Sequence, residues 1–225
     1  MGTLIACSHG TDSADGRRTI EELVALVRDR LPQTRVVQAF VDVQEPDITT
    51  VVDQEILADE VVVVPLLLSV GFHTAVDIAK AVRRHPGVRQ ADPLGTHPLV
   101  AQVLATRLRA SIGGTWLEGD AVVLAAAGSS NPAAVADVET AAAQLAALIP
   151  APVTIGYASA IEPRIPQAVQ TARDSGARRV IAASHVLAPG YFAGLVQAAG
   201  ADVVSAPLGV DPRMADVIID RFHAA

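Results

Sequence analysis

Apolar residues in this chain occur in short continuous runs that alternate with longer amphipathic segments. Runs without polar alternation, such as Thr3–Ser8 and Val61–Leu68, are typical of strands that helices cover on both faces of a parallel sheet. Segment 17–31 instead repeats its apolar residues at helical spacing. In the first half we predict strands at 3–8, 35–42, 61–68 and 90–93, and helices at 17–31, 48–56, 75–84 and 98–109.

The same series begins again after a glycine-rich break at 112–115. Residues 40–48 align without gaps on 157–165, and Gly71–His73 aligns on Gly190–Phe192. The second half has predicted strands at 120–127, 153–157, 179–184 and 202–205, and predicted helices at 133–148, 165–175, 192–199 and from 212. We therefore predict an α/β fold of two similar parallel-sheet units that arose by internal duplication and face each other across a cleft. The expected lobes are 1–112 and 120–225, with the flavodoxin-like strand order 2-1-3-4.

Composition narrows the class of protein. Of 225 residues, 51% are hydrophobic and only 3% aromatic, which favours a core of Val, Leu, Ile and Ala. The net charge is −7 with the basic residues scattered, so a nucleic-acid or anionic membrane surface is not expected. The single cysteine, Cys7, excludes an intrachain disulfide and fits a reducing compartment. Without a signal-peptide pattern or a membrane-length apolar run, we expect a cytoplasmic protein.

Three potential metal ligands follow the first three strands of the first half. His9 follows the first strand, Asp42 ends the second and His73 follows the third, with spacings of 33 and 31 residues. In the order 2-1-3-4 these strands are neighbours about 4.8 Å apart, so the three side chains are expected to converge. Two imidazoles and a carboxylate suit divalent Fe, Co, Ni or Zn, and three ligands leave coordination positions open for chemistry.

The second half provides an internal comparison for these ligands. The counterparts of His9, Asp42 and His73 are Ala127, Ser159 and Phe192. All three potential ligands are therefore absent together, as expected for residues that matter only as a set.

Three segments of the first half resemble the class II sirohydrochlorin chelatases. They are Cys7–Thr11, Ala39–Asp42 with Pro46 downstream, and Val63–His73. The resemblance implies a two-lobed chelatase-like fold and a lyase that inserts Co²⁺ on the way to cobalamin or Fe²⁺ on the way to siroheme. In the family pattern Glu is usual where Asp42 stands, and Ser where Thr11 stands.

The resemblance also implies how such a site would work. His9, Asp42 and His73 would bind the divalent ion, which is a substrate, and no organic cofactor is expected; Ni²⁺ suits the same ligands. His9 and His73 would be the catalytic residues, because an imidazole with a pKa of about 6.5 can accept the pyrrole protons. The tetrapyrrole would lie in the cleft against Ser8, Gly10, Thr11, Gly71 and Phe72. Candidate partners for its carboxylates are Arg17, Arg18, Lys80, Arg83, Arg84 and Arg164.

Two other functions remain open from the sequence. The chain is alternatively a metal or tetrapyrrole carrier that keeps the site without turnover. A histidine phosphatase is a second alternative, but it needs an arginine directly before the histidine, where Ser8 stands. His185 is interpreted as a core or cleft histidine. Two fused units make a monomer self-sufficient.

Overall fold

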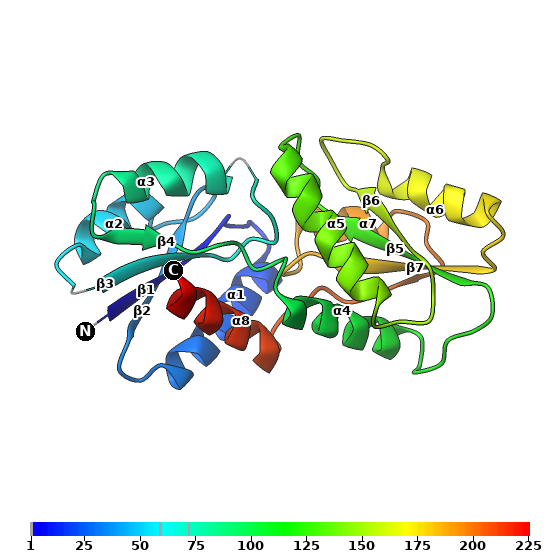
Figure 1. Cartoon of the computed structure of the whole chain (residues 1–225), viewed down its shortest axis with the longest axis horizontal. Helices are drawn as coiled ribbons and strands as arrows, with labels where there is room; N and C mark the ends of the chain where they lie inside the picture. The colour runs from blue at the N-terminus through cyan, green and yellow to red at the C-terminus, as the bar shows by residue number, and fades with distance from the viewer. Residues whose placement is uncertain (1, 59, 72) are drawn as a thin grey trace.

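Strands and helices alternate along the chain and form two parallel sheets (Figure 1). The structure is a computed structural model that describes residues 2–58, 60–71 and 73–225, without the side chains of residues 73–75. In this part of the chain each sheet has four strands, ordered β2-β1-β3-β4 and β6-β5-β7-β8, which confirms the predicted α/β fold and strand order. The strands are β1 (Gly2–Ser8), β2 (Arg35–Phe40), β3 (Glu60–Pro65), β4 (Val88–Gln90), β5 (Asp120–Ala126), β6 (Val153–Tyr157), β7 (Arg179–His185) and β8 (Val203–Val204).

Helices cover both faces of each sheet, which explains the continuous apolar runs of the central strands. The helical elements are α1 (Ala14–Arg30), α2 (Ile48–Glu55), the π-helical turn η1 (His73–Ile78), α3 (Ala79–Arg83), α4 (Pro98–Ser111), α5 (Pro132–Ala146), α6 (Ile165–Asp174), α7 (Tyr191–Gln197) and α8 (Pro212–Ala224). Helices α2 and α3 pack on one face of the first sheet, and α6 and α7 on one face of the second. The opposite faces share one continuous core with α1, α4, α5 and α8.

The two halves have the same backbone geometry where the sequence alignment places the repeat. The amide of Asp42 donates to the carbonyl of His9 at 3.0 Å, and the amide of Ser159 donates to the carbonyl of Ala127 at 2.9 Å. The single parallel bridges Phe40–Asp47 and Tyr157–Arg164 also correspond. These contacts confirm the pairing of His9 with Ala127 and of Asp42 with Ser159.

One helix from each half packs on the sheet of the other half. Helix α4, which precedes the break in the sequence pattern, contacts β7, β8 and α5, whereas the C-terminal helix α8 contacts β3 and α1. Figure 1 shows the red C-terminal helix beside the blue strand β1. The lobe boundaries at 112 and 120 stay a prediction. Helices α4 and α8 each contact elements on the other side of these boundaries in the sequence.

The structure differs from the predicted elements between β3 and α4. The helix expected at 75–84 is a π-helical turn followed by the short helix α3, and the strand expected at 90–93 lies at Val88–Gln90. The pairing of β1 with β3 runs without interruption to Cys7 and Pro65. Pro65 therefore ends the strand, where its missing amide proton costs no ladder hydrogen bond. Among the described helices, none is long and apolar enough to cross a membrane.

Candidate functional site

A cleft of about 710 Å³ lies at the carboxyl ends of the central strands of both sheets. Most of its lining comes from the ends of β1, β3, β5 and β7 and the segments after them: Ser8–Ser13, Leu66–Ser69 with Gly71, Ala126–Ser129, and His185–Phe192. Carboxyl ends of parallel strands are where open α/β sheets bind ligands. The predicted cleft between the two units is therefore present, and both halves contribute to its walls.

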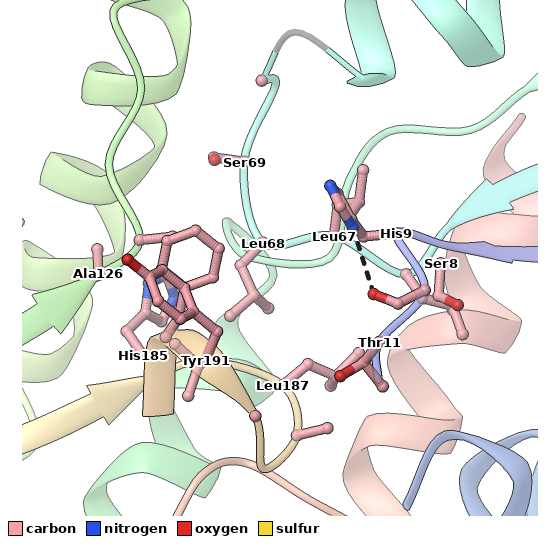
Figure 2. Close-up of a pocket in the computed structure, with 18 of the residues that line it drawn as sticks. Ser8, His9, Thr11, Leu67, Leu68, Ser69, Ala126, His185, Leu187 and Tyr191 are labelled. Atoms are coloured by element: carbon pink, nitrogen blue, oxygen red, sulfur yellow. Dashed lines mark hydrogen bonds between the residues drawn. The ribbon is translucent and has the colours of Figure 1, made fainter. Parts of the chain in front are cut away.

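His9 lies on the wall formed by the first half. Figure 2 shows its ring beside Leu67, with Ser8 and Thr11 on the same wall. The ring is half-buried, and Nδ1 lies 3.3 Å from the carbonyl oxygen of Gly10. A hydrogen bond connects this loop to the segment after β2, because the amide of Thr11 donates to the side chain of Gln44 at 2.9 Å. Of the residues predicted to contact a tetrapyrrole, Ser8, Gly10 and Thr11 line this wall.

Gly10 allows the loop after β1 to pass close to the end of β2. Its φ is +93°, and a Cβ atom at this position would lie 2.1 Å from the carbonyl oxygen of Asp42. Only glycine avoids both the left-handed backbone penalty and this collision. The close approach brings the backbones of His9 and Asp42 together.

The carboxylate of Asp42 does not point into the cleft. Asp42 is exposed, and its Oδ1 accepts a hydrogen bond from the amide of Val43 at 2.8 Å. It lines a separate small hollow formed by Val41–Glu45 and Asp47. Among the described residues, which exclude the side chain of His73, no three His, Cys, Asp or Glu side chains are grouped to hold a metal ion. The three-ligand site stays a prediction.

The segment after β3 leads to His73. Gly71 lines the cleft, and its amide donates to the carbonyl of Ser69 at 2.9 Å. His73 is the first residue of η1, and its side chain lies outside the described residues, as does the whole of Phe72. Their predicted contacts with metal and substrate are therefore not described by the structure.

His185 lies on the opposite wall and was not predicted as a site residue. It ends β7, pairs in register with Ala126 and is 2% exposed. Burial lowers the pKa of His185 to about 4, so the imidazole is neutral at pH 7. Its Nε2 has no hydrogen-bond partner in the part of the chain that the structure describes. Its position at the carboxyl end of a central strand was the sequence signal that could have identified it.

Two aromatic residues at the start of α7 complete that wall. The rings of Tyr191 and Phe192 meet edge to face with centroids 5.4 Å apart, and Tyr191 is 75% exposed. Figure 2 shows Tyr191 beside His185 at the edge of the cleft. In the sequence these aromatics were visible only as counterparts of Phe72 and His73.

The cleft has few charged side chains in its described lining, which includes Asp12. Its described lining is largely apolar and includes no lysine or arginine. Of the predicted carboxylate partners, Arg17 lies beside the first wall, where its Nε donates to the carbonyl of Thr11 at 2.8 Å. Three others form ion pairs on the surface: Arg18 with Asp15, Arg84 with Asp53 and Arg164 with Glu162.

Comparison with known proteins gives a match to one family model and to one curated relative. A family model named CbiX matches residues 3–111 and 121–225. A Methanopyrus kandleri protein named sirohydrochlorin cobaltochelatase is 23% identical over 141 residues, which cover 50% of this chain and 99% of that protein.

Two solved structures have the same fold. SirB from Bacillus subtilis with Fe³⁺ has a TM-score of 0.80 at 21% identity, covering 99% of this chain and 94% of SirB. A CbiX described as the terminal enzyme for biosynthesis of siroheme in denitrifying bacteria has a TM-score of 0.71 at 24% identity, covering 100% of this chain and 99% of that one.

Proposed function

The chain belongs to the CbiX family, and from this premise we propose that it is a sirohydrochlorin chelatase. The reaction is insertion of Co²⁺ or Fe²⁺ into a sirohydrochlorin-type tetrapyrrole, with release of the pyrrole protons. The observation that carries the proposal is the cleft, because the family model spans the segments that form both of its walls. Cobalt is supported by the name of the Methanopyrus relative, and iron by the SirB structure with Fe³⁺.

We propose His9, Asp42 and His73 as the ligands that deliver the metal ion. The three residues follow adjacent parallel strands, and the hydrogen bond from the Asp42 amide to the His9 carbonyl keeps two of them side by side. For Asp42 to bind the ion directly, its carboxylate must leave the Val43 amide. Three protein ligands leave open positions, so the ion can lose water and pass to the macrocycle. Ni²⁺ is a further candidate ion, because it accepts the same ligand types.

The macrocycle is expected to lie between the two walls. Its apolar faces fit the leucine, alanine and aromatic lining, and Ser8, Gly10, Thr11, Gly71 and Phe72 are the proposed contacts on the first wall. Its carboxylates would extend to the rim, where Arg17 lies, because a carboxylate buried without a cation is unfavourable. Since one chain supplies both walls, we expect a monomer to be active.

Proton transfer is assigned to the histidines of the first wall. As the metal–nitrogen bonds form, the pyrrole N–H bonds break and the protons need acceptors within hydrogen-bond reach. An imidazole that has released the ion has a free lone pair for this purpose. His9 and His73 are thus proposed to act first as ligands and then as proton acceptors.

A spectroscopic assay tests this function. Purified protein, Co²⁺ and sirohydrochlorin should give the visible spectrum of the metallated product faster than Co²⁺ and sirohydrochlorin alone. His9→Ala and His73→Ala should each lower this rate at least about 100-fold, as expected for loss of a group that contacts the reacting atoms. The control is His223→Ala, which removes an exposed histidine from α8.

The possible results separate the alternatives. Wild-type rates in both His9→Ala and His73→Ala would contradict the assigned roles of these histidines. Tight stoichiometric binding of the tetrapyrrole without any metal insertion would instead favour a carrier.

A further inference from the structure

Two side chains of the second half bind both backbone polar groups of one residue in the first half. Val70 lies in the segment after β3, here called the β3 loop (Leu66–Gly71). Its amide donates to Oδ2 of Asp137 at 2.7 Å, and its carbonyl accepts from Nδ2 of Asn131 at 2.8 Å. Asp137 lies in α5, and Asn131 caps the same helix by accepting from the amide of Ala133 at 3.0 Å. The β3 loop is therefore tied to α5 across the cleft.

The rest of the β3 loop is already fixed by its own half. Its first amide, from Leu66, donates to the carbonyl of Cys7 at 2.7 Å, and the carbonyl of Leu67 accepts from Leu94 at 2.8 Å. Behind Leu68 the chain passes so close that a Cβ atom on Gly95 would lie 1.8 Å from the Leu68 carbonyl oxygen. The contacts from α5 extend this fixed path to Val70, three residues before His73.

The corresponding contact between the loop after β7 and helix α1 does not have these two hydrogen bonds. The counterpart of Val70 is Pro189, which has no amide proton to donate. Asn131 corresponds to Ser13, whose hydroxyl accepts from the amide of Gly16, and Asp137 corresponds to Thr19, whose hydroxyl donates within α1. The loop at Pro189 and the start of α1 instead approach each other through their backbones. A Cβ atom on Gly16 would lie 2.4 Å from the Pro189 carbonyl oxygen. Among the described residues of the two loops, this pair of side-chain hydrogen bonds therefore occurs on the loop that leads to His73 and not on its counterpart.

We propose that Asn131 and Asp137 are positioning residues that fix the β3 loop and thereby set the metal affinity of His73. The inference rests on the proposed function, because it takes His73 as a metal ligand. A loop held at both backbone groups of Val70 loses less conformational freedom when the ion binds, and a preorganised ligand set binds more tightly. The second half, which has lost its own ligands, would then still contribute to metal binding.

The test measures metal affinity in the absence of tetrapyrrole. Co²⁺ is titrated into the full chain by equilibrium dialysis, so that substrate binding does not enter the result. Asn131→Asp keeps the oxygen that caps α5 and removes the donor to Val70. Asp137→Ala removes the acceptor, whereas Asp137→Asn keeps an oxygen that can accept from the Val70 amide. Glu139→Ala removes an exposed carboxylate from the same helix and is the control.

We expect Asn131→Asp and Asp137→Ala each to raise the Kd for Co²⁺ about 10-fold, the effect typical of losing a hydrogen bond that orients a ligand. Asp137→Asn and Glu139→Ala should remain close to wild type. In the insertion assay the first two variants should raise KM for Co²⁺ and recover the wild-type kcat at saturating Co²⁺. A loss of folded protein would lower kcat instead.

The outcomes separate this inference from the proposed function. Wild-type Co²⁺ affinity in Asn131→Asp and Asp137→Ala, together with weakened binding in His73→Ala, would overturn the positioning role and leave the chelatase proposal standing. Wild-type affinity in His73→Ala would contradict the metal site itself. If Asp137→Ala does not fold, Asn131→Asp decides the question, because it preserves side-chain size and the cap of α5. Equal loss in Asp137→Asn and Asp137→Ala would assign the effect to charge and reject the hydrogen bond.

Discussion

At the scale of single residues, His185 places a polar imidazole that is 2% exposed on the wall of the cleft. Its Nε2 is unpaired among the described residues, and its counterpart in the first half is the core residue Leu66. A buried polar group without a partner costs about 1–3 kcal/mol of stability. Among the side chains found with such an atom, which are Thr3, Trp116, Gln144, His185 and Arg221, His185 is the one that lines the cleft.

His185→Leu is predicted to change how stability depends on pH. Burial lowers the pKa of His185 to about 4 in the folded chain, against about 6.5 when unfolded. Below pH 6.5 the unfolded chain therefore binds a proton that the folded chain does not, and stability falls until the pH reaches the folded value. Between pH 7 and 5 the wild type should lose about 2 kcal/mol more than His185→Leu.

Urea unfolding at several pH values measures this difference. At pH 7 the variant should be about 1 kcal/mol more stable than wild type, because a leucine leaves no unpaired group. Parallel stability profiles for the two proteins between pH 7 and 5 would refute the assignment of a neutral buried imidazole.

The position of a candidate residue on the sheet edge was easier to predict from the sequence than the direction of its side chain. His9 follows β1 directly, as predicted, because the end of a predicted strand fixes the position of the next residue along the sheet edge. The direction of the Asp42 carboxylate was not predictable, because it depends on competition from the neighbouring amide of Val43. The cross-cleft bonds of Asn131 and Asp137 were also missed, since they require the relative placement of two sheets.

At the scale of elements, the loops after β1 and β5 offer a matched pair for testing the site. Gly10 and Gly128 have φ values of +93° and +91°, and a Cβ atom would lie 2.1 Å and 2.2 Å from the carbonyl oxygens of Asp42 and Ser159. Replacement by alanine should cost each loop at least about 1–2 kcal/mol for the left-handed backbone alone. Gly10→Ala should also weaken Co²⁺ binding, because it moves His9 and Asp42 apart.

Gly128→Ala is the control for that experiment. It strains the same kind of loop, but the neighbouring residues Ala127 and Ser159 cannot bind the ion through an imidazole or carboxylate. Thermal unfolding should show similar losses in both variants, whereas Co²⁺ titration should show a loss only in Gly10→Ala. Equal weakening of Co²⁺ binding in both variants would indicate that reduced folding stability causes the loss, and not a changed geometry of His9 and Asp42.

The order of the elements was predictable, but some of their local forms were not. Alternating apolar and amphipathic segments allow few topologies, because parallel crossovers are right-handed and short. The π-helical turn at His73–Ile78 overlaps the start of the ordinary helix predicted at 75–84, since apolar spacing over so few residues cannot distinguish the two. The packing of α4 and α8 on the sheet of the opposite half was also not predictable, because the amphipathic pattern of a helix does not indicate which sheet its apolar face covers.

At the scale of the molecule, the exchange of α4 and α8 joins the two halves through a common core. Helix α8 contacts β3 and α1 of the first half, and α4 contacts β7 and β8 of the second. The inner faces of both sheets therefore belong to one set of buried residues. Opening the cleft widely would disrupt that core, so we expect the two walls to keep a nearly fixed separation.

Truncating a buried side chain in α8 should destabilise the sheet that is remote from it in sequence. Phe222 is buried in the shared core, and its ring lies near Gly2 at the start of β1. Phe222→Ala should cost about 3–5 kcal/mol. Hydrogen exchange should accelerate first in β1, β2 and β3, although these strands lie in the other half of the sequence. Leu104→Ala in α4, also fully buried, should cost about 2–5 kcal/mol and accelerate exchange first in β5, β6 and β7. If each variant instead loosened the sheet of its own half, the exchange of helices would be wrong.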